Sequence, residues 1–184
     1  MSREAPKDVL DAFCIDFCKV VEKHCPYIIV SGFIVISTGR MRGTEDIDMI
    51  IPRLTKSQLE NLHNDLLMND FICMQTDSKD EIYEYLQDNT SVRYTRKNRP
   101  FPEMEIKFAK DELDEIQLQT RQKIALTGLD VWFGSVDMNI AFKEEYLKSQ
   151  KDLEDATHLR TVFKEQINED EIRRIKRKIR ELRL

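Results

Sequence analysis

Long apolar runs and glycine are both scarce in this 184-residue sequence. No stretch approaches the roughly 20 apolar residues that cross a bilayer, and Met1 to Asp11 contains no apolar region typical of a signal peptide. With 41% hydrophobic residues and only 5 glycines and 5 prolines, the composition is that of a folded chain and not of a disordered polymer. We therefore expect an intracellular, cytoplasmic protein without a membrane segment.

The sequence also lacks the motifs of several common site classes. Its four cysteines form no C-x-x-C pair, and Cys14 and Cys18 lie four apart beside Phe13 and Phe17, so we interpret them as reduced core thiols. No Walker-type glycine loop and no Ser-His-Asp arrangement is present. The net charge of -5 gives no general attraction to nucleic acid, although residues 173–183 are dense in Arg and Lys.

Hydrophobic periodicity predicts one compact domain of the α+β (α/β) class, which 184 residues are enough to form. We place its body at residues 1–165, followed by a C-terminal amphipathic helix at 166–184 whose apolar stripe must pack on the domain or on a partner. Residues 93–96 stay ambiguous, and 123–133 are read as a hairpin around Gly128. Helices are expected near 7–25 and 33–37, from 55 and from 78, at 111–120, 136–149 and 151–163 and from 168, with strands at 27–30, 46–51, 71–74 and 103–108.

The chemistry-bearing pattern is a D-x-D pair in the strand that Pro52 ends. Residues two apart in a strand project from the same side, which separates the Cα atoms of Asp46 and Asp48 by roughly 6.5 to 7 Å. Two carboxylates so placed can hold Mg²⁺ or Mn²⁺, although surface carboxylates are the plainer reading of this pattern alone. Glu105, from the alternating segment 103–108, could complete a two-metal clamp. Glu103 is the alternative third ligand.

A small-residue turn lies 14 residues before the acidic pair. The apolar run that ends at Val30 is followed by Ser31-Gly32 and a short helix. Such a turn exposes backbone N–H groups where partial positive charge favours a phosphate, and the Ser31 hydroxyl can donate to phosphate oxygens. A tight strand-to-helix turn without a ligand is the other reading of Ser31-Gly32.

The stretch from Val30 to Asp48 resembles the signature of the DNA polymerase beta-like nucleotidyltransferases, particularly small prokaryotic and archaeal members. The shared pattern is a small-small turn, a helix, Gly-Arg, and R-x-T-x-D-h-D, in which Arg42 and Thr44 precede the acidic pair. This resemblance implies a nucleotidyltransferase fold, with a mixed sheet flanked by helices. It also implies an NTP donor and Mg²⁺ at Asp46 and Asp48. Those proteins usually have Gly-Gly or Gly-Ser where this chain has Ser31-Gly32.

A second part of the resemblance lies further along the chain. Lys143 and the K-D-x-x-D-like segment 151–155 are similar to elements of nucleotidyltransferases from abortive-infection and toxin–antitoxin systems. The resemblance implies that Lys143 and Lys151 meet the NTP phosphates, with Asp155 holding Lys151 or assisting the acceptor. Without the resemblance, Lys151 and Asp155 read as an i, i+4 ion pair on a helix.

Three functions follow from these patterns. The first is metal-dependent transfer of an NMP group to RNA, protein or a small molecule, by in-line attack at the α-phosphate, with Asp46, Asp48 and Glu105 as catalytic and metal-binding residues. Ser31, Gly32, Arg42, Thr44, Lys143, Lys151 and Asp155 would bind the substrate. The second is an inactive module of the same fold that binds nucleotide or a partner, including a second copy, through the C-terminal stripe. The third is nucleic-acid binding by the basic end, which lacks the interleaved aromatic residues of such sites.

Overall fold

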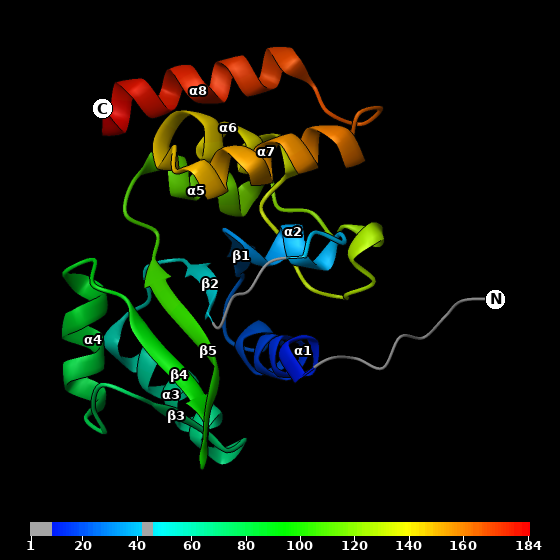
Figure 1. Ribbon diagram of the computed structural model, residues 1–184. Helices are drawn as coiled ribbons and strands as arrows, with labels where there is room; N and C mark the ends of the chain where they lie inside the picture. The colour runs from blue at the N-terminus through cyan, green and yellow to red at the C-terminus, as the bar shows by residue number, and fades with distance from the viewer. Residues whose placement is uncertain (1–8, 42–45) are drawn as a thin grey trace.

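The computed structural model describes residues 9–41 and 46–184, which fold into one mixed sheet covered by helices (Figure 1). The strands are β1 (Ile28–Val30), β2 (Asp46–Ile51), β3 (Phe71–Cys73), β4 (Val92–Arg96) and β5 (Arg99–Phe108). The α-helices are α1 (Val9–Glu22), α2 (Phe33–Ser37), α3 (Lys56–Met68), α4 (Lys79–Gln87), α5 (Glu112–Gln119), α6 (Val136–Phe142), α7 (Gln150–Val162) and α8 (Glu169–Arg183). A 3₁₀ turn, η1 (Ala125–Thr127), and a π-helical turn, η2 (Lys143–Leu147), complete the elements.

The sheet has the order β1-β2-β5-β4-β3. The β2 and β5 strands run parallel, while the other neighbouring pairs are antiparallel. The sheet is therefore mixed, and the fold class expected from the sequence, α+β with a mixed sheet flanked by helices, is confirmed. The parallel pair at its centre brings residues 46–51 and 103–108 side by side although more than 50 positions separate them in the sequence.

One face of the sheet carries the main apolar core. Because strand residues alternate, Ile47, Met49 and Ile51 of β2 all point to this face, and all three are fully buried. The side chains of α1, α3 and α4 cover this face of the sheet and form one apolar cluster with it. Within the cluster, Phe13 and Phe17 of α1 pack edge-on against Phe71 of β3. This packing leaves the alternate residues of β2, which include both aspartates, on the opposite face.

Local sequence signals explain where most elements begin and end. Thr55 and Gln58 form the reciprocal capping box expected at the start of α3. Ser78 caps α4 by accepting from the backbone of Glu81, but the Glu81 side chain contacts Thr76, so only half of that expected box forms. Strand β2 has the predicted bounds, which end where Pro52 removes a backbone donor.

The predicted hairpin at residues 123–133 is wrong. Gly128 has a left-handed backbone, with φ of 69°, but it ends the 3₁₀ turn η1 and does not join two strands. Phe133 forms isolated bridges with Ile29 and with Gln122. Reciprocal backbone hydrogen bonds between Gln122 and Phe133 close the segment as a wide loop, and Ile29 donates to the Trp132 carbonyl, so residues 132–133 lie along the β1 edge of the sheet.

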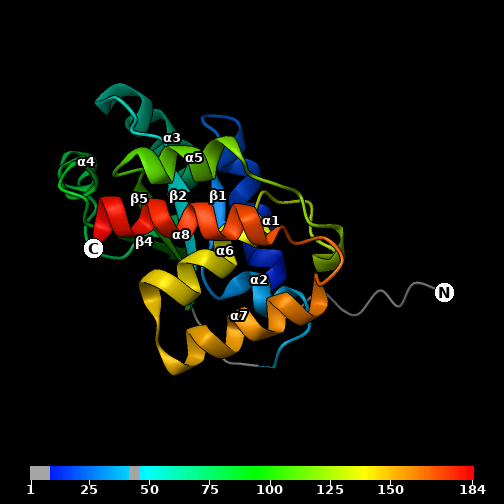
Figure 2. The same ribbon diagram turned by 90° about the horizontal axis from the view of Figure 1, so that it is seen from above.

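The stripe of the C-terminal helix packs on the chain itself. Ile172, Ile175 and Ile179 are buried in the same apolar cluster as the sheet, whereas Leu182 is 43% exposed. Figure 1 shows α8 lying over α5 and α6, which appear on either side of it when the molecule is seen from above in Figure 2, and both helices contact it. Of the two alternatives for this stripe, the three isoleucines follow packing on the domain, while contact of the helix with a second copy or a partner protein stays a prediction. The division at residues 165 and 166, which concerns independent folding, stays a prediction.

Replacing Ile179 with Val is expected to lower the free energy of unfolding by about 1 kcal/mol, because the lost methylene leaves space that a packed core cannot fill. Leu182→Val, on the same helix but half exposed, is the matched control and should change stability by less than about 0.5 kcal/mol. Urea denaturation of both variants measures the difference. Equal losses would show that α8 packs differently.

The basic residues of α8 are largely paired with acidic residues. Arg183 donates to Asp111 at 2.9 Å and to Asp114 at 2.7 Å, and Lys176, Lys178 and Arg180 form ion pairs with glutamates of α5 and η2. The acidic segment at 111–115 and the basic end of the chain thus lie against each other. This pairing reduces the positive charge that the third function, nucleic-acid binding, would need.

No helix among the described residues is both long enough and apolar enough to cross a membrane.

Candidate functional site

Strands β2 and β5 bring the predicted acidic residues to one face of the sheet. In their parallel register Asp46 is level with Glu103, and Asp48 is level with Glu105. Neighbouring strands lie about 4.8 Å apart, so each pair of carboxylates starts from adjacent backbone positions. The predicted juxtaposition of Asp46, Asp48 and Glu105 is therefore present at the level of the backbone.

Burial and neighbouring charges raise the pKa of Asp48. Its pKa is raised above the ordinary value, first because it is removed from solvent and second because of the negative charge of Glu105; Asp46 adds a smaller effect in the same direction. Lys107 and a hydrogen bond from Ser31 oppose the rise. Crowded negative charge of this kind favours binding of a cation, because the ionised carboxylates then gain a counter-charge.

The Ser31-Gly32 turn lies directly beside Asp48. Val30 pairs with Asp48 across the β1–β2 ladder, and the next residue, Ser31, has a left-handed backbone with φ of 69°. Gly32 has φ of −76°, which any residue can adopt. The special conformation thus falls on the residue that differs from the usual Gly of the resembling proteins. The serine accepts this conformation while its hydroxyl reaches Asp48.

Because a left-handed backbone costs a residue with a Cβ atom about 1–2 kcal/mol, we expect Ser31→Gly to be more stable than Ser31→Ala by about 1 kcal/mol. Both variants lack the hydroxyl, so their difference isolates the backbone. Thermal unfolding of the two proteins measures it. An alanine variant at least as stable as the glycine variant would contradict the strained turn.

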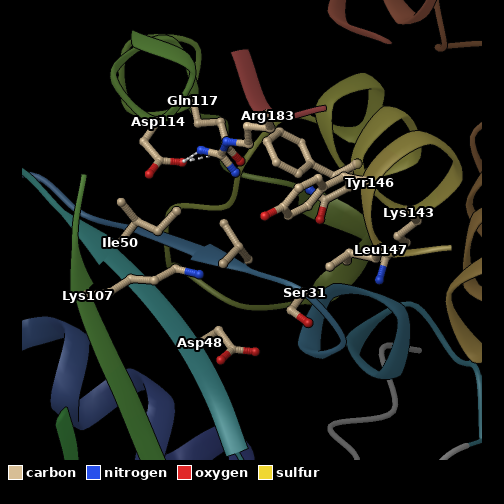
Figure 3. Close-up of a pocket in the computed structure, with 13 residues that line it drawn as sticks. Ser31, Asp48, Ile50, Lys107, Asp114, Gln117, Lys143, Tyr146, Leu147 and Arg183 are labelled. Carbon is tan, nitrogen blue, oxygen red and sulfur yellow. Dashed lines mark hydrogen bonds and ion pairs between the residues drawn. The ribbon is translucent and has the colours of Figure 1, made fainter. Parts of the chain in front are cut away.

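A cavity of about 260 Å³ lies between this face of the sheet and the C-terminal helices (Figure 3). Ser31, Asp48 and Lys107 line it from the β1–α2 turn, β2 and β5, and Tyr146 and Arg183 line it from the helices opposite. Its remaining lining residues are Val30, Ile50, Asp114, Gln117, Asn139, Phe142, Lys143 and Leu147. The sheet side presents carboxylate, lysine and hydroxyl groups, and the helical side presents aromatic side chains and amides together with the charged groups of Asp114, Lys143 and Arg183. Apolar surface with a few polar groups is typical of a small-molecule site.

Lys143 and Asp155 form a buried ion pair behind the cavity. The Lys143 Nζ donates to Asp155 Oδ2 at 3.1 Å, and both side chains are nearly inaccessible to solvent. Arg40, which follows α2, also pairs with Asp155, and its other nitrogen bonds Glu154 at 2.6 Å. Lys143 lines the cavity as well, so it is placed near any ligand there while its charge is balanced from behind.

Lys151 is not brought to the cavity. It is exposed at the start of α7, and its backbone carbonyl accepts from Arg40 at 3.5 Å. The carboxylate of Asp155 contacts Lys143 and Arg40, where an i, i+4 pair with Lys151 was expected from the sequence. Arg42 and Thr44 lie outside the described residues.

The carboxylate of Glu105 contacts Ser91 and Arg93, on the β4 side of its strand and not on the β2 side that carries Asp48. The hydroxyl of Ser91 donates to its Oε1 at 2.6 Å, and Arg93 lies 3.7 Å from its Oε2. Across residues 9–41 and 46–184, no three His, Cys, Asp or Glu side chains are spaced to hold a metal ion together. The carboxylates of Asp46 and Asp48 are hard oxygen donors of the type that Mg²⁺ prefers, so the pair fits that ion, while Glu105 does not join it in this arrangement.

Several residues at the site were not predicted from the sequence. Arg40 follows Gly39 in the stretch that carries the resemblance, so its Gly-Arg position was visible but its partner was not. Arg93 could not be assigned because the segment 93–96 was ambiguous. Gln117, Tyr146 and Arg183 come from helices whose packing the sequence does not specify.

Comparison with solved structures identifies the architecture. An antigenic nucleotidyltransferase-like protein from Paracoccidioides brasiliensis matches 92% of this chain and 87% of its own, with a TM-score of 0.54 and 17% identity. The solution structure of the antibiotic-resistance factor ANT(2'')-Ia matches 95% of this chain and 93% of its own, with a TM-score of 0.57 and 14% identity. This chain has a nucleotidyltransferase fold.

A second ANT(2'')-Ia structure, in complex with adenylyl-2''-tobramycin, matches 92% of this chain and 95% of its own, with a TM-score of 0.52 and 15% identity. No protein-family model matches the sequence, and no curated relative does either. At these identities the likeness establishes the nucleotidyltransferase fold, and the residues of the cavity carry any argument about chemistry.

Proposed function

We propose that this protein is a nucleotidyltransferase that moves an NMP group from an NTP to an acceptor by in-line attack at the α-phosphate. One observation carries the proposal: Asp48 of β2 lines a cavity that also presents Ser31 and Lys107, and Asp46 lies two residues before it on the same strand. The nucleotidyltransferase fold supports it, and the stretch that resembles the signature of such proteins, Val30 to Asp48, begins in β1 and ends in β2.

Asp46 and Asp48 would hold Mg²⁺ or Mn²⁺ in this proposal. When bound, the ion would supply positive charge to the triphosphate and to the attacking oxygen. The chain itself positions the reactants: Lys107 projects into the cavity from the strand beside Asp48, and the Ser31 hydroxyl lies at its edge (Figure 3). Both can donate to phosphate oxygens, and the apolar side chains of Phe142 and Leu147 line the same space.

Lys143 and Asp155 act together in this account. The ammonium of Lys143 is held behind the cavity wall by the Asp155 carboxylate, which Arg40 also contacts, so a contact with a phosphate would require the lysine to turn from Asp155. Lys151 is exposed on α7 and would contribute only to the outer approach of a substrate.

The test is a transfer assay with labelled NTPs and Mg²⁺ against a panel of acceptors: RNA, protein and small molecules. Tobramycin belongs in the panel because a structural neighbour was solved with its adenylyl derivative. The proposal requires label transfer that disappears in Asp48→Asn and persists in Asp130→Asn, an exposed aspartate that does not line the cavity. Transfer that survives in Asp48→Asn would exclude Asp48 from the chemistry.

A second function, nucleotide binding without transfer, is favoured by the engagement of Glu105 with Ser91 and Arg93. Two carboxylates can hold one ion and a nucleotide, whereas a two-metal mechanism needs a further ligand. Calorimetric titration with an NTP and Mg²⁺ separates the two functions. Saturable binding, with no product from any acceptor in the panel, would support the second.

A further inference from the structure

A row of charged side chains crosses the sheet at the level of Asp48. In the β-ladders Asp48 is level with Glu105, and Glu105 is level with Arg93 of β4. Residues opposite each other across a ladder project from the same face, with Cβ atoms about 5 Å apart. The row therefore reads, from β2 to β4, as two carboxylates followed by a guanidinium.

Arg93 bridges two glutamates of β5. Its Nε lies 3.7 Å from Oε2 of Glu105 and 3.7 Å from Oε2 of Glu103. The second oxygen of Glu105 accepts from Ser91 at 2.6 Å, so each oxygen of this carboxylate faces a partner on the β4 side. A guanidinium remains charged at any ordinary pH, which makes Arg93 a permanent cation in this position.

This arrangement bears on the number of metal ions that the acidic face can hold. In two-metal sites the ions lie about 3.5–4 Å apart and share a row of carboxylates. Here the positive charge beside Glu105 comes from a side chain, and coordination by Glu105 would require it to leave Arg93 and Ser91. The lack of any three-ligand group among residues 9–41 and 46–184 agrees with this arrangement.

We infer that Arg93 is a positioning residue that takes the place of a second cation and limits the site to one divalent ion, held by Asp46 and Asp48. The inference rests on the proposed function for the existence of that first ion. It adds that the charge of Arg93 sets the metal stoichiometry, by holding Glu105 away from the aspartates.

The test is a calorimetric titration of the full chain with Mn²⁺, which reports stoichiometry without any activity. We expect one ion for the wild type and for Arg93→Lys, and two for Arg93→Gln, in which Glu105 is released to coordinate. The double variant Arg93→Gln with Glu105→Gln should return to one ion. Arg93 is 46% exposed in its side chain, so its loss should leave the fold intact, and thermal unfolding of each variant checks this.

Arg174→Gln is the matched control, because it also removes an exposed arginine from an ion pair with a glutamate, Glu171, but on α8. A second ion in this control would make the gain in Arg93→Gln unspecific and overturn the inference. One ion of unchanged affinity in Arg93→Gln, or two in the wild type, would overturn it as well while leaving the metal site in place. A wild type that binds no ion would instead overturn the metal part of the proposed function.

Discussion

Replacing Asp48 with Asn is expected to stabilise the protein at neutral pH while it lowers nucleotidyl transfer at least about 100-fold. The loss of transfer follows from removing a charge that the transition state needs, for which a factor of about 10²–10³ is typical. The gain in stability follows from the raised pKa of Asp48, since its charged form is disfavoured by burial and by the neighbouring Glu105. The charge of Asp48 therefore lowers the stability of the fold, and we propose that its role in the reaction outweighs this cost.

The stability that Asp48→Asn gains over the wild type should be largest at neutral pH and smaller in acid. A carboxyl whose pKa is higher in the folded than in the unfolded chain destabilises the fold once both states are ionised, so the cost is full at neutral pH. It disappears as the pH falls through the raised folded value towards the unfolded value of about 4. The stability advantage of Asp48→Asn should shrink over that interval.

Thermal unfolding of the wild type and Asp48→Asn from neutral to acidic pH, without divalent ions, measures this. Asp130→Asn serves as the control, because the pKa of that exposed carboxyl is lowered by Lys123, so its removal should not stabilise the protein. An Asp48→Asn protein less stable than the wild type at neutral pH would contradict the assignment of Asp48 as a destabilising charge.

Asp155→Ala is expected to lower the free energy of unfolding by about 3–5 kcal/mol, the usual cost of removing one partner of a buried ion pair. Asp155 is 0% exposed and contacts both Lys143 and Arg40, so the substitution withdraws a carboxylate from two positive charges. The buried ammonium of Lys143 has little access to water that could replace this contact. Transfer should fall too, because Lys143 would lose its fixed position at the cavity wall.

Urea denaturation measures the loss, with Lys151→Ala as the control on the same helix. Lys151 is exposed, so its removal should change stability by less than about 0.5 kcal/mol. Comparable losses of stability in the two variants would support an ion pair between Asp155 and Lys151, as helix spacing suggests. They would contradict the ion pair between Asp155 and Lys143.

Elements with strong periodicity could be predicted from the sequence, because their signals are local. The end of β2 was predicted from Pro52, and the alternation of side chains along a strand placed both aspartates on one face. Strand β4 could not be assigned, because its short and polar sequence gains its pairing from β5 and β3 on either side. Because β4 was not assigned, neither the position of Arg93 nor its contact with Glu105 could be predicted.

The other contacts were predicted wrongly or not at all, because the residues that form them are far apart in the sequence. Helix spacing offered Lys151 as the nearest cation to Asp155, whereas the fold supplies Lys143 and also Arg40, which is 115 residues away. The isoleucine stripe of α8 was visible as a stripe, but nothing in the sequence specifies that α5 and α6 cover it. Packing between helices decides such contacts, and it depends on the whole set of apolar faces.

The proposed function requires that Asp46 and Asp48 hold a metal ion against a triphosphate in the cavity that Ser31, Asp48 and Lys107 line. The most direct measurement is a crystal structure with a non-hydrolysable NTP analogue and Mn²⁺, in which anomalous scattering locates the ion. We expect a peak in contact with both aspartates and the triphosphate within reach of Lys107. A nucleotide bound elsewhere, or a cavity containing nucleotide but no ion at the aspartates, would contradict the claim.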